Sequence, residues 1–227
     1  MRELPMLLNG PMVRATMERR KVMTRRPIRI SLPKGWYRWT KSRTQIPEGW
    51  RPWTPHEGYD GHAWFVPSDY VPDGTMRALG EPQGMALSVR NPLGVPGDLL
   101  YARETTQKWG DNHGQYRATL TPVIGDREHM CNGRAVWWYS RDVCPSIHMP
   151  KWAARLWVLN TGVGVEKGPY ISEADARAEG FEGAKAFMEW WANQYPGMDW
   201  RFVTSYEVIE QLPDAVRNET TWPEGKR

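Results

Sequence analysis

A lysine and a threonine three residues apart occur near the N-terminus, in the segment RRKVMTRR. An uncharged lysine can accept the proton of a hydroxyl nucleophile, and burial or neighbouring cations favour that uncharged form. Arg25 and Arg26 are such cations, so Lys21 and Thr24 are candidates for base-assisted attack if the chain turns between them. The spacing alone is common in proteins of every function and does not identify an enzyme.

The same segment is strongly basic, with five cations within eight residues. Guanidinium groups match the geometry of phosphate and carboxylate groups, which predicts an anion site. The alternative is a solvated basic surface, because charge runs usually face water. The whole chain has 30 Lys and Arg against 26 Asp and Glu, a net charge of +4 that permits a nucleic-acid partner without requiring one.

A second set of chemically capable residues is His129, Cys131, Cys144 and His148. Thiolate and imidazole donors suit zinc, but zinc ligands usually occur in closely spaced C-x₂₋₄-C pairs. We therefore expect ordinary thiols and no metal or other cofactor. The sequence also has no phosphate-binding Walker loop, no G-x-G-x-x-G, no H-E-x-x-H and no G-x-S-x-G motif, so the enzyme classes that depend on them lose support.

The elements around Lys21 and Thr24 follow from the local pattern. Residues 4–8 are apolar and are followed by Asn-Gly-Pro, which predicts a strand and a turn. Pro11 suits the first turn of a helix that we expect to end near Lys21. A strand over 22–30 then places Thr24 just beyond a helix-to-strand junction.

The rest of the chain divides into a central insertion and a C-terminal half. Between residues 31 and 96 tryptophans are scattered among Pro, Gly and Ser without a helical or strand period, which predicts an irregular insertion. Its tryptophans either stack on bases or fill a core, whereas core packing is favoured for Trp152, Trp157, Trp190 and Trp191. We expect strands over 99–102, 116–120, 135–139, 154–165 and 201–209, and helices over 172–180 and after Gly183.

Length and composition restrict the class of protein. The chain of 227 residues suits one elaborated domain, and its mean hydropathy is −0.67. No window approaches the roughly 20 apolar residues needed to span a bilayer, and the N-terminus lacks the features of a secretory signal. The chain has two cysteines and 14 tryptophans. Because the N-terminus lacks secretory features, we expect a cytoplasmic protein whose two thiols stay reduced.

Four segments, in this order, resemble a phage and prophage family of ASCH-domain proteins: LPMLLNGPMVRATMERRKVMTRRPI, GVPGDLLYARET, PSIHMPKWAARLWV and ISEADARAEGF. The resemblance covers residues 1–30 and about 93–209, and Pro145 to Arg155 is its most specific part. It implies an α+β fold of the PUA-like type, a small β-barrel with flanking helices. We therefore expect one domain over 1–217, with the insertion at about 31–92 and a flexible tail over 218–227.

The resemblance implies a cleft for RNA or a modified nucleoside. Some small bacterial ASCH proteins are amidohydrolases that remove the acetyl group of acetylcytidine with a Lys, a Thr and a Glu. Lys21, Thr24 and Glu179 match those positions, and Arg26 matches the arginine that follows the threonine. The chain departs from the family's Gly-Arg-Lys-Thr, which reads Arg-Arg-Lys-Val here, and it is longer than those enzymes.

The expected function is binding of a nucleoside or single-stranded nucleic acid, RNA rather than DNA, in a cationic cleft, with hydrolysis of an acylated cytidine. The alternatives are a non-catalytic reader of RNA or modified DNA, and a ribonuclease. If the protein is phage-encoded, it would act in the host cytoplasm. The sequence does not determine the oligomeric state. The residues predicted to bind the substrate or nucleic acid are Arg20, Arg25, Arg26, Arg103, Glu104, His148 and Arg155.

Overall fold

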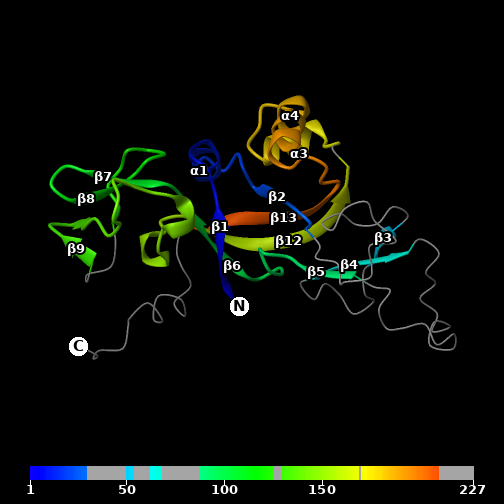
Figure 1. Cartoon of the computed structure of the whole chain (residues 1–227), viewed down its shortest axis with the longest axis horizontal. Coiled ribbons are helices and arrows are strands. Elements are labelled where there is room, and N and C mark those ends of the chain that lie inside the picture. Colours follow the sequence, from blue (N-terminus) through cyan, green and yellow to red (C-terminus); the bar gives the residue numbers. More distant parts are fainter. Residues whose placement is uncertain (30–49, 54–61, 68–86, 125–128, 169, 210–227) are drawn as a thin grey trace. The chain divides into compact units, whose positions relative to one another are not determined.

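The computed structural model describes residues 1–29, 50–53, 62–67, 87–124, 129–168 and 170–209 (Figure 1). The chain forms two compact units. The first unit contains Met1–Val22, Gly97–Asn160 and Tyr206–Arg227, and the second contains Met23–Pro96 and Thr161–Ser205. The predicted insertion at 31–92 therefore belongs to the second unit. The predicted tail, 218–227, and Trp36 and Trp39 lie outside the described residues.

The first unit begins with β1 (Glu3–Leu7) and α1 (Gly10–Met17), and the sequence predicts both elements. The helix ends at Met17 rather than near Lys21, and Arg19 beyond it has φ 56°. The side chain of Asn9 caps α1 by accepting a hydrogen bond from the Met12 N–H at 3.0 Å. Next to β1 lies β6 (Leu99–Arg103), which pairs with β1 in parallel and with the start of β12 (Trp157–Lys167) in antiparallel. Asp98 fixes the start of β6, because its carboxylate accepts three hydrogen bonds from Arg2.

The remainder of the first unit consists of short strands around a small core. These are β7 (Thr106–Trp109), β8 (His113–Tyr116), β9 (Met130–Cys131), β10 (Arg134–Ala135) and β11 (Val143–Cys144), followed by 3₁₀ turns at Ser146–His148 and Lys151–Ala153. The predicted strand over 116–120 is wrong after Tyr116, because Leu120 has φ 58° and its N–H returns to the Tyr116 carbonyl. The predicted strand over 135–139 is also wrong beyond Ala135.

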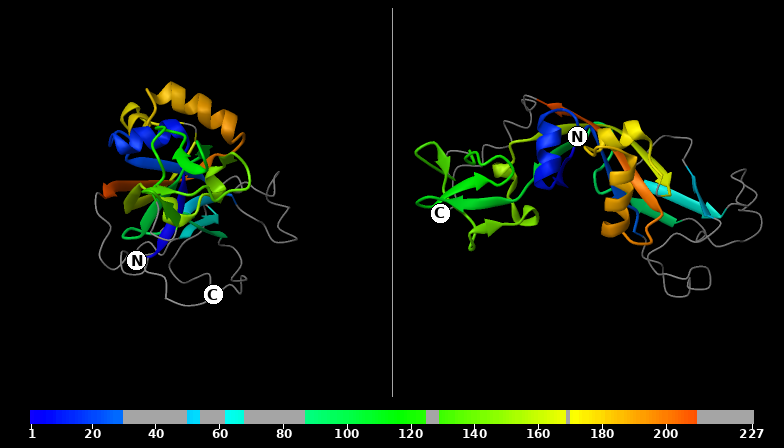
Figure 2. Two further views of the ribbon diagram at one scale, coloured as in Figure 1. Left: turned by 90° about the vertical axis from the view of Figure 1, so that its left-hand side faces the viewer. Right: turned by 90° about the horizontal axis from the view of Figure 1, so that it is seen from above.

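In the second unit, β13 (Trp200–Ile209) is hydrogen-bonded to β2 (Met23–Pro27) and to β12. The two helices α3 (Glu173–Ala178) and α4 (Ala184–Gln194) cover one face of β2 and β13 (Figures 1 and 2). The Ser172 side chain caps α3, as predicted, by accepting from the Asp175 N–H. Buried Ala176, Phe187 and Trp191 join the two helices.

The predicted insertion contains regular structure. Strands β3 (Trp50–Trp53), β4 (His62–Pro67) and β5 (Leu87–Arg90) form an antiparallel sheet, so the prediction of an irregular segment is wrong for these residues. Phe65 of β4 is fully buried and packs with Ile28 and Phe202. Aromatic and β-branched residues favour strands, and this short signal was obscured by the surrounding prolines and glycines.

The sheets and helices confirm the α+β class. Within the described ranges the sheets are open, and none closes into the barrel that the resemblance implies. No helix in the described part of the chain is long and apolar enough to cross a membrane.

The helix pair yields a stability prediction. Phe187 is fully buried and contacts the rings of Phe181 and Trp191, with centroid distances of 5.3 and 5.7 Å. Phe187→Ala removes this ring and leaves a cavity, which should lower the free energy of unfolding by about 3–5 kcal/mol in urea denaturation. Lys185→Ala, an exposed position on the same helix, is the control and should change it by less than about 0.5 kcal/mol. A loss below about 1 kcal/mol for Phe187→Ala would contradict this packing.

Candidate functional site

The second unit contains a group of charged side chains beneath α3 and α4, which we term the arginine–carboxylate cluster. It consists of Arg25 on β2, Arg201 on β13, Glu166 on β12, Asp175 on α3 and Glu179 at the end of α3. The two arginines are wholly buried, with side chains 1% exposed. Charged side chains are almost never buried to this extent unless they are paired.

Arg25 is the centre of the cluster. Its Nε and Nη2 donate to the two oxygens of Glu166, both at 3.0 Å. Its Nη2 also donates to Asp175 at 3.1 Å, and its Nη1 donates to Glu179 at 3.2 Å. One guanidinium group thus holds three carboxylates from two different elements.

Arg201 shares Glu166 with Arg25. Its Nε donates to Glu166 Oε2 at 3.1 Å, and its Nη2 donates to the Tyr170 carbonyl at 2.5 Å. Both guanidinium groups also lie near the Phe187 ring, at 5.9 Å for Arg25 and 5.4 Å for Arg201. The aromatic ring excludes water on that side, which strengthens the ion pairs.

The electrostatics of the cluster follow from its composition. Burial acts to raise the pKa of Glu166, but hydrogen bonds and charges from Arg25 and Arg201 outweigh it and lower that pKa. Burial acts to lower the pKa of Arg25, but Glu166, Glu179 and Asp175 outweigh it and raise that pKa. Burial lowers the pKa of Arg201, and the neighbouring Arg25 adds to this effect. Arginine stays charged in proteins, so two cations face three carboxylates here.

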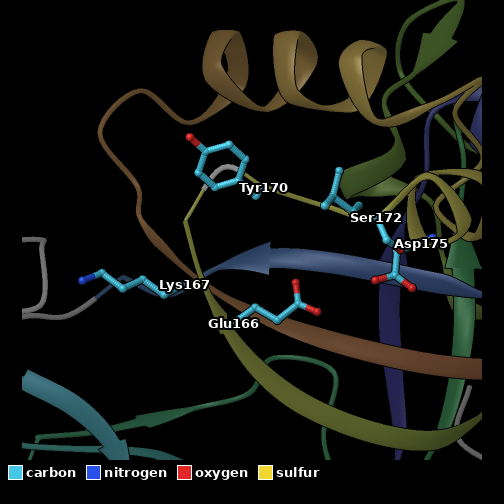
Figure 3. A pocket seen from close by; sticks show the side chains of 6 residues that line it. Glu166, Lys167, Tyr170, Ser172 and Asp175 are labelled. Atoms are coloured by element: carbon cyan, nitrogen blue, oxygen red, sulfur yellow. Dashed lines mark hydrogen bonds between the residues drawn. The ribbon is translucent and has the colours of Figure 1, made fainter.

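A hollow of about 330 Å³ opens beside the cluster. Figure 3 shows the carboxylates of Glu166 and Asp175 at this hollow, while Lys167 extends away from Glu166. These two carboxylates are the more exposed members of the cluster, at 36% and 38% of the side chain, and Tyr170 is 81% exposed. The residues that line the hollow are Glu166, Lys167, Tyr170, Ile171, Ser172 and Asp175.

The three predicted catalytic residues are all buried. Lys21, Thr24 and Glu179 are 0%, 4% and 3% exposed. Lys21 belongs to the first unit, and Thr24 and Glu179 belong to the second. Successive strand residues point to opposite faces, so Thr24 points away from the face that carries Arg25 and lies opposite Thr204. The carboxylate of Glu179 therefore meets Arg25 rather than the side chain of Thr24.

The basic segment is not one solvated surface. Arg25 faces inward onto three carboxylates, so its guanidinium is engaged within the protein, and its predicted role in binding substrate or nucleic acid stays a prediction. Arg20 is exposed and forms an ion pair with Glu18 at 2.5 Å. Arg26 is half-buried on β2, on the same face as Thr24.

The other predicted binding residues lie in the first unit. Glu104 is buried, and both of its oxygens accept hydrogen bonds from Arg155 at 2.8 and 2.9 Å. Arg103 donates from Nε to the Met149 carbonyl at 2.7 Å. His148 is exposed and stacks on Tyr139 with a centroid distance of 5.7 Å. The structure therefore joins Glu104 to Arg155, and it places Arg103 and His148 in separate contacts.

The four zinc-ligand candidates have different environments. Cys131 is exposed and Cys144 is buried, and burial raises the pKa of the Cys144 thiol. His129 stacks on Trp152 at a centroid distance of 4.4 Å. Among the described residues no three metal-ligating side chains come together.

Glu166, Asp175 and Arg201 were not among the predicted site residues. The sequence does indicate that Arg201 is unusual, because WRFVTSYEVI has the pattern of a largely buried strand and contains one arginine near its start. A buried arginine needs a carboxylate partner, which would have directed attention to Glu166 at the end of the neighbouring strand. Their pairing across 35 residues has no local pattern.

No protein-family model matches the chain, and no curated protein or solved structure matches it either.

The cluster makes stability depend on pH. A carboxylate with a lowered pKa stabilises the folded state above its unfolded pKa, and that contribution is lost as the pH falls through the folded pKa. The free energy of unfolding should thus drop below roughly pH 4.3, the ordinary value for glutamate. Glu166→Gln should lower stability at pH 7 and reduce the acid-induced loss, measured by urea denaturation at several pH values. Glu189→Gln, an exposed position on α4, is the control, and equal acid sensitivity in both variants would contradict the role of Glu166.

Proposed function

We propose that the protein is an amidohydrolase that removes the acyl group from an N4-acylated cytidine or a closely related nucleoside. Lys21, Thr24 and Glu179 are the residues that carry the reaction. The resemblance to ASCH amidohydrolases supports this assignment, and so does the burial of all three polar side chains. Catalytic groups are commonly buried, because removal from water adjusts their protonation to the reaction.

The observation that carries the proposal is the contact between Arg25 and Glu179. It connects a carboxylate to a strand residue 154 positions away in the sequence, next to Thr24. Lys21 is only three residues before Thr24, so at most about 11 Å of chain separates them.

The hollow beside the cluster is lined by none of Lys21, Thr24 and Glu179, and its charge suits an uncharged nucleoside better than a phosphate chain. Its volume of about 330 Å³ is at the lower end of the range for small-molecule sites. Three carboxylates against two arginines favour hydrogen-bond donors, such as the N–H groups of a base, and disfavour phosphate. Exposed Tyr170 offers a face on which a base can stack.

In the proposed reaction, the Thr24 hydroxyl oxygen bonds to the acyl carbon while uncharged Lys21 accepts the hydroxyl proton. Lys21 then passes this proton to the exocyclic nitrogen as the carbon–nitrogen bond breaks, which releases cytidine. Water attacks the acyl group on Thr24, releases the carboxylic acid and restores the hydroxyl. In the alternative route, water activated by Lys21 or Glu179 attacks directly and Thr24 only positions the substrate.

The neutralised arginines distinguish this proposal from its two rivals. A reader of nucleic acid or a ribonuclease would use unpaired cations along the phosphate backbone. Arg20, Arg25 and Arg155 are instead bound to carboxylates. This arrangement favours a small nucleoside over a strand at the predicted catalytic residues.

The decisive experiment measures acetate release from N4-acetylcytidine. Lys21→Ala should reduce kcat by about 10²–10⁴-fold and change KM far less, because it removes the base and not a binding contact. Because Lys21 is buried, Lys21→Met is measured as well, since it retains the volume of the side chain and should lose the same activity. Lys185→Ala on the exposed face of α4 is the control and should keep full activity.

The outcomes separate the candidate functions and the two routes. An acetyl group found on the Thr24 peptide by mass spectrometry would establish the covalent route, and its absence with full turnover would favour direct attack by water. No product from acylated nucleosides, with binding retained, would replace the proposal with the reader. Degradation of bulk RNA without acetate release would replace it with the ribonuclease.

The stacking role of Tyr170 is tested separately. Tyr170→Ala removes the ring and should raise KM for N4-acetylcytidine by roughly 5–150-fold, the equivalent of about 1–3 kcal/mol for one stacked base. The value of kcat should change little, because the ring does not touch the reacting bond. A fall in kcat at constant KM would contradict this role.

A further inference from the structure

The first unit contains a second hollow, of about 210 Å³. Like the hollow beside the arginine–carboxylate cluster, it is lined by none of the predicted catalytic residues. It lies where the start of α1 approaches the residue after Glu104 and the turn after β8. The residues that line it are Gly10, Arg14, Glu104, Thr105, Arg117 and Ala118. Two arginines and one carboxylate therefore determine its charge.

The carboxylate of Glu104 is already neutralised. Arg155 binds both of its oxygens, and the same guanidinium donates to the hydroxyls of Thr119 and Thr121, each at 2.9 Å. Arg155 also lies over the Tyr116 ring at 3.8 Å. This pair is held from several sides, so Glu104 contributes little negative charge to the hollow.

Among the described residues, the two arginines of the hollow use few of their hydrogen-bond donors. Arg14 uses one N–H, from Nη1, to bind the Ala118 carbonyl at 2.8 Å, which holds it at the wall. The guanidinium of Arg117 has no partner among the residues that the structure describes, and its backbone N–H anchors the turn to the Thr105 carbonyl at 3.1 Å. The hollow is thus lined by one positioned and one uncommitted arginine, and its carboxylate, Glu104, is already paired with Arg155.

We propose that this hollow binds a phosphate group, with Arg14 and Arg117 as its ligands. Guanidinium groups bind phosphate through paired, charge-assisted hydrogen bonds, and each arginine here has donors to spare. The start of α1 adds a favourable dipole for an anion, because Gly10 is its first residue. The phosphate belongs either to a mononucleotide or to a nucleic-acid strand, since both present the same oxygens.

This inference goes beyond the proposed hydrolase. A free acylated nucleoside carries no phosphate, so the reaction does not require this hollow. A phosphate bound here would distinguish a nucleotide or a strand from a nucleoside.

Calorimetric titration of the full-length protein tests the site. Cytidine 5′-monophosphate should bind at least about tenfold more tightly than cytidine, and inorganic phosphate should compete with it, because hydrogen bonds between charged groups are stronger than neutral ones. Arg117→Gln should abolish this difference. Its guanidinium contacts no other described group, so the change leaves the fold intact. Arg14→Gln should act in the same way, and Arg141→Gln, an exposed arginine of the same unit outside the hollow, is the matched control.

The two sources of the phosphate are compared with a short oligocytidylate in the same assay. Tighter binding of the oligonucleotide than of the monophosphate, lost in Arg117→Gln, indicates a strand, whereas equal affinity indicates a mononucleotide. Equal affinity of the wild-type protein for cytidine and its monophosphate would overturn the proposal, as would equal losses in Arg117→Gln and Arg141→Gln. Acetate release from unphosphorylated N4-acetylcytidine is measured on the same variants. It should be unchanged, so failure of the phosphate site is distinguishable from failure of the hydrolase.

Discussion

The buried guanidinium of Arg25 is the constraint on which the second unit depends. A charge removed from water is tolerated only if its hydrogen-bonding groups are satisfied, and Arg25 achieves this with three carboxylates. These come from the end of β12 and from α3, so the same interaction fixes the strand and the helix against β2. Removing Arg25 would leave Glu179 buried without this partner, which is more costly than losing an exposed ion pair.

The pairing of arginines with carboxylates also determines which guanidinium groups are available to bind a ligand. A sequence with many arginines near its N-terminus suggests a phosphate-binding surface, but a guanidinium that already binds a carboxylate is not available for phosphate. Arg25 and Arg155 are both engaged in this way, and Arg117 is not. The distribution of carboxylates, rather than the number of cations, therefore distinguishes the hollow beside Glu166, where we propose an uncharged ligand, from the hollow beside Arg14, where we propose an anionic one.

Elements that depend on contacts between residues close in the sequence could be predicted, whereas those that depend on contacts between distant segments could not. Local signals were sufficient for α1, for the Ser172 cap of α3 and for α4, because capping residues and helical periodicity act within a few positions. The strands of the insertion were missed because they are stabilised by pairing with one another. The turn at Leu120 was missed because it depends on a left-handed backbone conformation at that residue. At the site, Glu179 was reached only through a family resemblance. Glu166 and Arg201 escaped because a buried ion pair between distant strands has no spacing rule.

Strand geometry connects the charge cluster to the proposed nucleophile. A shift of β2 by one residue against β13 would move every side chain to the other face, and Arg25 would then face Phe65 and Phe202 instead of its carboxylates. The cost of that burial excludes the shifted register. With Arg25 held on one face, Thr24 must point to the other, opposite Thr204, whose hydroxyl accepts a hydrogen bond from Asn91. The ion pairs of one face thus determine which environment the hydroxyl of Thr24 enters, although no member of the cluster needs to touch it.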